Sequence, residues 1–255
     1  MYRILIRFYE ELNFFLDRDH RQREFSVDFP GKRSVKDLIE SLGVPHVEVD
    51  LILVNSTPVT FDYLVQDNDR ISVYPEFERL DIRGVTPLKD RPLRQTRFVA
   101  DVHLHTLARK LRMLGFDTDY EKHRDDDVLA EISEREKRVL LTRDRQLLMR
   151  KNVSRGLYVR NTDPDKQIRE IIRRMDLYSS IEPFKRCVLC NTPIKPLEPE
   201  NPEYERLASQ VPRDVKTWCD RYFYCPTCMK IYWRGKHIEK MEAFIEDVMS
   251  EASSQ

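Results

Sequence analysis

Short segments of alternating hydrophobic and polar residues open the chain, and this period of two predicts β-strands with one buried face. Alternation predicts strands at residues 3–8 and 25–29, and residues 51–54 and 70–74, on either side of a turn-rich segment, are predicted as further strands. Between the second and third strands, Ser34 is suited to cap a helix whose apolar positions run to Gly43, a typical helix terminator. Two strands, a helix and then further strands form the element order of a β-grasp domain, which we assign to residues 1–80.

The pattern changes after this domain. Residues 81–96 contain Pro87 and Pro92 with many charges and few large apolar residues, which is typical of a linker. From residue 97 to residue 182, apolar strand-like runs alternate with helix-like segments, and this alternation predicts an α/β domain with a parallel sheet.

Three aspartates follow predicted strands of this α/β domain. Asp101, Asp144 and Asp163 each come just after an apolar run. Ligands of parallel sheets bind at the carboxyl ends of the strands, and carboxylates are the ligands that Mg²⁺ and Mn²⁺ prefer, so the three acids predict a catalytic metal site. Asp163 fits a second interpretation equally well, as the N-cap of the helix that follows it; Asp144 could likewise cap its own short helix, although we favour the metal site for it.

Two further acids, Asp125 and Asp126, start another predicted helix, where one could cap the helix and one could reach the metal; solvated surface charge is the alternative. The chain has 44 basic and 44 acidic residues, but the charges are unevenly placed. Residues 117–136 hold nine acids against three bases, whereas residues 143–174 hold ten bases against four acids. An acidic pocket with basic flanks would suit a phosphate-bearing substrate, although solvated helix faces give similar counts.

Arginines near these acids are candidate phosphate contacts. Arg109 and Arg112 lie three residues apart on one predicted helix face, and Arg143 lies between a strand end and Asp144. A solvent-facing structural role is the alternative for the pair on the helix. We expect Arg143 to lie at the rim of the site.

The four cysteines Cys187, Cys190, Cys225 and Cys228 form two C-x-x-C pairs, the pattern of a closed four-thiolate zinc site. They predict a zinc ribbon over residues 183–245 that holds structural zinc. Such reduced cysteines, together with the lack of a membrane-spanning run or signal peptide, lead us to expect a cytoplasmic protein with no membrane partner.

Basic residues follow the second cysteine pair. Lys230, Arg234, Lys236 and His237 make a candidate RNA-binding patch. Aromatic residues around this pair could stack on bases, or they could form the small core of the ribbon, which we favour.

Several of these motifs occur together in an order that resembles the Mut-seven C-terminal RNase family. The resemblance rests on the segments Phe98–Leu104, Leu107–Thr118 and Leu140–Arg145, the two cysteine pairs and Ile231–His237. It implies a PIN-like nuclease fold with a zinc ribbon. Residues 1–78 are similar to the ubiquitin-like β-grasp domain of that family, and the absence of a terminal Gly-Gly argues against sulfur-carrier activity.

The resemblance implies RNA cleavage, with Asp101, Asp144 and one of Asp125 and Asp126 at the acidic positions of the family. We therefore expect a ribonuclease dependent on Mg²⁺ or Mn²⁺. Two alternatives remain open: a non-catalytic protein that binds tRNA or rRNA, and an adaptor that binds a protein partner through its β-grasp domain.

Overall fold

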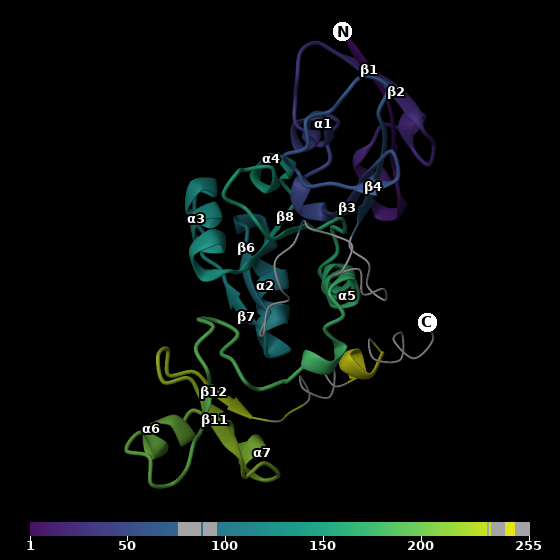
Figure 1. Ribbon diagram of the computed structural model, residues 1–255. Coiled ribbons are helices and arrows are strands. Elements are labelled where there is room, and N and C mark those ends of the chain that lie inside the picture. Colours follow the sequence, from purple (N-terminus) through teal and green to yellow (C-terminus); the bar gives the residue numbers. More distant parts are fainter. Residues whose placement is uncertain (76–87, 89–95, 234, 236–242, 248–255) are drawn as a thin grey trace. The chain divides into compact units, whose positions relative to one another are not determined.

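A computed structural model describes residues 1–75, 88, 96–233, 235 and 243–247 (Figure 1). It divides into two compact units. The first contains Met1–His103 and His123–Val159, and the second contains Leu104–Lys122 and Arg160–Gln255. Most of the linker predicted at residues 81–96 lies outside the described residues. Among the described helices, none is long and apolar enough to span a membrane.

The first unit begins with a five-stranded mixed sheet in the order β2-β1-β5-β3-β4. β1 runs antiparallel to β2 and parallel to β5. The elements are β1 (Tyr2–Phe8), β2 (Phe25–Phe29), α1 (Val35–Ser41), β3 (Val49–Val54), β4 (Thr57–Pro58) and β5 (Arg70–Pro75), with 3₁₀ turns η1 (Glu10–Phe15), η2 (Arg18–His20) and η3 (His46–Glu48). The predicted β-grasp fold is confirmed.

Local sequence explains where helix α1 begins and ends. The amide of Asp37 donates to the Ser34 hydroxyl at 3.1 Å, so Ser34 caps α1 as predicted. The chain leaves the helix through Gly43, whose φ of +88° is readily adopted only by glycine. The apolar residues of β1 that alternate with exposed ones, such as Ile4 and Ile6, are buried beneath the helix in one core.

The rest of the first unit is a parallel sheet with the strand order β6-β8-β9. The elements are β6 (Arg97–Ala100), α3 (Asp126–Glu136), β8 (Val139–Thr142), α4 (Arg145–Leu148) and β9 (Gly156–Tyr158). α3 packs on β6 and β8, and α4 packs on β8 and β9. All four residues of β8 are buried, as expected of a central strand covered on both faces. The predicted parallel sheet is confirmed.

The second unit combines helices with a small antiparallel sheet in the order β10-β11-β12. Its elements are α2 (His105–Met113, preceded by the turn η4, Val102–Leu104), β7 (Asp117–Asp119), α5 (Pro164–Arg174), η5 (Tyr178–Ser180), β10 (Lys195–Pro196), α6 (Tyr204–Ala208), α7 (Arg213–Lys216), β11 (Tyr222–Tyr224) and β12 (Ile231–Trp233). α2 packs on α5 and β7. The small sheet carries a separate core that includes Leu207 and Tyr222.

Candidate functional site

Asp101 lies directly after β6 and is 5% exposed. Its amide donates to the carbonyl of Leu141 on β8 at 3.0 Å, which continues the parallel pairing of the two strands. The hydroxyl of Thr142 donates to Oδ2 of Asp101 at 2.6 Å. The carboxylate of Asp101 is therefore held at the carboxyl ends of β6 and β8, where the sequence placed it.

Asp144 is held by the same threonine. Its amide donates to Oγ1 of Thr142 at 2.9 Å, and its Oδ1 accepts from the amide of Gln146 at 2.7 Å. The cap interpretation of Asp144 is thus confirmed, while the exposed side chain remains at the strand end. Sequence reasoning assigned no role to Thr142, although its place as the last residue of β8 and two residues before Asp144 was a usable signal.

Asp126 is the first residue of α3 and keeps 48% of its side chain exposed. Partial burial raises its pKa, and the negative charges of Asp144 and Asp101 raise it further. The positive charge of Arg150 offsets this increase only in part: its Nη2 lies 4.0 Å from Oδ2 of Asp126, and its Nη1 donates a hydrogen bond to Asp127. Asp101, Asp126 and Asp144, hereafter the acidic cluster, therefore lie near one another in the first unit.

The other two candidate acids are placed differently. Asp125 is the exposed N-cap residue of α3, and its side chain makes no capping hydrogen bond. Asp163 belongs to the second unit, where its Oδ1 accepts from the amides of Asp165 and Lys166, both at 3.0 Å. These contacts are those of a helix cap, so the cap interpretation of Asp163 is confirmed.

The predicted arginines have different environments. Arg109 is exposed on α2, as a phosphate contact would require. Arg143 is half-buried, and its guanidinium donates to the carbonyl of Val159 at 3.0 Å.

Arg112 does not fit the prediction of a phosphate contact. It is 3% exposed, and its guanidinium donates to the carbonyls of Thr118 at 2.8 Å and Leu189 at 2.7 Å. Burial lowers the pKa of this guanidinium. The helical spacing that put Arg112 beside Arg109 could not reveal that the loop of the first cysteine pair covers it.

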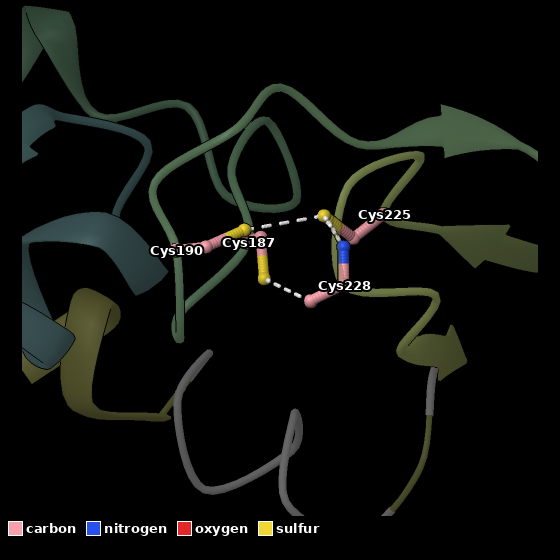
Figure 2. Close-up of side chains that lie close together, drawn as sticks. All are labelled: Cys187, Cys190, Cys225 and Cys228. Carbon is pink, nitrogen blue, oxygen red and sulfur yellow. Dashed lines mark hydrogen bonds between the residues drawn. The ribbon is translucent and has the colours of Figure 1, made fainter.

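The four predicted zinc ligands converge from two loops, as Figure 2 shows. Sγ of Cys187 lies 3.4 Å from Sγ of Cys228, and Sγ of Cys190 lies 3.3 Å from Sγ of Cys225. All four sulfurs lie within 4.8 Å of one another. Tetrahedral zinc with Zn–S bonds of about 2.3 Å requires sulfurs roughly 3.8 Å apart, so the group fits zinc.

The two cysteine loops share one local geometry. The amides of Asn191 and Met229 each donate at 2.9 Å to the carbonyl of the first cysteine of their loop, Cys187 and Cys225. Both residues have positive φ, +66° and +57°. The same turn therefore aims both pairs of sulfurs at one point.

The side chain of Tyr232 contacts the loop of the first cysteine pair. The hydroxyl of Tyr232 lies 3.0 Å from Sγ of Cys187 and accepts from the amide of Val188 at 3.2 Å. Burial and the contact with Cys187 raise the pKa of Tyr232, so the phenol keeps its proton near neutral pH. Tyr232 is thus occupied within the protein, in keeping with the structural role that we favoured for the aromatic residues.

Of the predicted basic patch, the structure describes only Lys230, which is exposed with its ammonium 6.0 Å from the centroid of the Tyr232 ring. Arg234, Lys236 and His237 lie outside the described residues.

Comparisons with known protein families match both parts of the chain. The family model described as Mut7-C RNAse domain matches residues 96–245, and the one described as Mut7-C ubiquitin matches residues 1–81. No curated protein and no solved structure matches. The RNAse match covers more than half of the 255 residues and contains both the acidic cluster and the four cysteines, so it indicates a ribonuclease that acts on RNA. The chain therefore belongs to the Mut7-C RNAse domain family.

Proposed function

We propose that this protein is an endoribonuclease that hydrolyses RNA phosphodiester bonds with Mg²⁺ or Mn²⁺ at the acidic cluster. The observation that carries the proposal is the grouping of Asp101, Asp126 and Asp144 from three different elements, close enough for the first and last to raise the pKa of Asp126. Unrelieved carboxylate repulsion costs stability, and a bound divalent cation removes it.

The spacing of the acids bears on which cation they suit. Among the described residues, the four cysteines form the compact group of potential metal ligands, and the three acids do not form a group of that kind. Mg²⁺ keeps several of its waters and uses one or two carboxylates directly, so a looser acidic group fits it. When bound, such an ion supplies an activated water and neutralises charge on the phosphate.

The protein residues have distinct proposed roles. Asp101 and Asp144 are proposed to hold the ion. The hydroxyl of Thr142 orients both residues, because it donates to the carboxylate of Asp101 and accepts from the backbone amide of Asp144. Asp126 completes the group from α3. The exposed Arg109, together with Arg143, Lys230, Arg234, Lys236 and His237, is proposed to hold the RNA backbone, whose phosphates attract such cations.

Structured RNA such as tRNA or rRNA is the proposed substrate class. The proposed location is the cytoplasm, because a site of four zinc thiolates requires a reducing compartment. The β-grasp domain is an additional proposed contact surface for a protein partner. A protein that binds RNA without cutting it is the alternative function, which the grouping of three acids does not favour.

The test compares cleavage of labelled total RNA by the wild type, Asp101→Asn and Asp144→Asn with Mg²⁺ or Mn²⁺. Glu134→Gln, an exposed acid further along α3, is the matched control because it removes the same charge away from the cluster. We expect loss of cleavage in the two aspartate variants only, with folding and zinc content unchanged. Binding without cleavage by the wild type would instead establish the alternative.

A further inference from the structure

The β-grasp domain contributes to the core of the nuclease sheet. Val47, in the turn η3, is 6% exposed and packs in one hydrophobic cluster with nuclease residues that include Leu140 and Leu148. A Cβ on Gly156 of β9 would lie 3.4 Å from a methyl group of Val47 and 2.5 Å from Leu148, so the small residue at 156 leaves room for this contact. An independent adaptor domain would not fill the core of its neighbour.

Polar contacts fix the same turn against the nuclease strands. His46 hydrogen-bonds the carbonyl of Val153 at 3.0 Å through Nε2 and Glu40 at 2.7 Å through Nδ1. The buried Glu48 accepts from the amide of Tyr158 at 2.6 Å. Buried polar groups need hydrogen-bond partners, so these pairs favour one arrangement of the turn against the nuclease residues.

A third contact of the β-grasp domain involves the residue next to Asp144 in the sequence. Arg145, the residue after Asp144, donates from Nη1 to the carbonyl of Phe15 at 3.1 Å. Its guanidinium lies 5.9, 5.2 and 5.8 Å from the ring centroids of Phe14, Phe15 and Tyr158. A planar guanidinium among aromatic rings holds its orientation better than an ammonium does.

We infer that Arg145 is a positioning residue through which the β-grasp domain orients Asp144. Arg145 is the first residue of α4, and Asp144 is the N-cap of that helix. Anchoring the arginine on Phe15 therefore sets the first turn of α4 and, with it, the direction of the Asp144 carboxylate. This inference rests on the proposed function for its catalytic consequence, but its structural part can be measured without cleavage.

The test compares Arg145→Ala and Arg145→Lys with Arg135→Ala. Arg135 is an exposed arginine on α3 that forms ion pairs with Glu131 and Glu136. Three quantities are measured in the full-length protein: kcat and KM for RNA, the affinity for Mn²⁺, and amide hydrogen exchange over residues 142–148.

For Arg145→Ala we expect kcat to fall about tenfold or more with KM within about twofold, because misplacing a catalytic group lowers the rate without removing substrate contacts. Mn²⁺ should bind more weakly and exchange should rise over residues 142–148. Arg145→Lys keeps the charge and should recover part of each loss, and Arg135→Ala should match the wild type.

Unchanged exchange and unchanged Mn²⁺ affinity in Arg145→Ala would overturn the inference, as would equal losses in Arg135→Ala. If the wild type cleaves no RNA, the proposed function fails; altered Mn²⁺ affinity and exchange in Arg145→Ala would still support positioning, and their constancy would refute it.

Discussion

Thr142 and Asp101 are joined by a buried hydrogen bond of 2.6 Å, in which the threonine hydroxyl donates to the carboxylate while accepting from the amide of Asp144. A single hydroxyl thus connects the acids that end two neighbouring parallel strands. The side chain of Asp101 and the backbone of Asp144 are thereby linked through one residue of β8.

Replacing Thr142 with valine tests this relationship. The variant keeps the shape but leaves a buried carboxylate oxygen and the Asp144 amide without their partner, and we expect it to lower the free energy of unfolding by about 1–3 kcal/mol. Thr142→Ser retains the hydroxyl and should lose less. Equal stability of the valine variant and the wild type in urea denaturation would show that the hydroxyl contributes no net stabilisation.

Replacing Asp126 with asparagine should stabilise the metal-free protein, because it removes one of three mutually repelling charges. The side chain is 48% exposed and therefore screened, so the expected gain is below about 1 kcal/mol. Added Mg²⁺ should stabilise the wild type more than the variant. Thermal unfolding with and without Mg²⁺ measures both effects, and Glu134→Gln is the control; a loss of stability in Asp126→Asn without metal would contradict the repulsion.

Zinc binding should depend on the four cysteines of the two C-x-x-C pairs and not on the fifth cysteine, Cys219. We expect one zinc per chain in the wild type, and loss of zinc together with unfolding of the β10–β12 sheet in Cys187→Ser or Cys225→Ser, because metal binding supplies the folding energy of such small modules. Cys219→Ser is the matched control, since its thiol contacts the carbonyl of Arg221 and lies outside the four-sulfur group. Metal analysis and near-ultraviolet circular dichroism read out both effects, and normal zinc in Cys187→Ser would exclude the four-thiolate site.

Arg109 and Arg112 should behave oppositely although they are neighbours on one helix. Arg112→Ala leaves the buried carbonyl of Thr118 and the partly buried carbonyl of Leu189 without this donor and should cost about 1–3 kcal/mol of stability. Arg109→Ala should leave stability within about 0.5 kcal/mol and weaken RNA binding with a shallower salt dependence. Denaturation and salt-dependent RNA titration separate the two; a stable Arg112→Ala with weakened RNA binding would restore the phosphate role.

Acidification should lower the free energy of unfolding, in part because Glu136 becomes protonated. Hydrogen bonds from Arg138 and then Arg135 hold the pKa of Glu136 below its usual 4.5. A depressed carboxyl pKa contributes stability that is fully present above the unfolded value and is lost as the pH falls through the folded one. The stability difference between the wild type and Glu136→Gln should therefore be constant near neutral pH and shrink below about pH 4.5. A difference that grows on acidification would show that the contribution has another origin.

Local structure was predictable because it depends on neighbours in the chain. Alternation along β1, the Ser34 cap, Gly43 at the end of α1 and the two C-x-x-C spacings all report on contacts within a few residues. The positions of Asp101 and Asp144 could be predicted for the same reason, since Asp101 directly follows β6 and Asp144 comes two residues after the end of β8. The boundaries assigned to the linker and to the zinc ribbon stay predictions.

The amino-acid sequence was sufficient to predict most of the helices and strands, the order of the domains and the grouping of the four cysteines, because periodicity and spacing act within one segment. Three features required the folded structure: Thr142 joins two of the acids, a cysteine loop covers Arg112, and Val47 packs in a core outside its own domain. A helical or strand period shows which residues share a face, but not which distant segment covers that face. That choice is made by long-range packing.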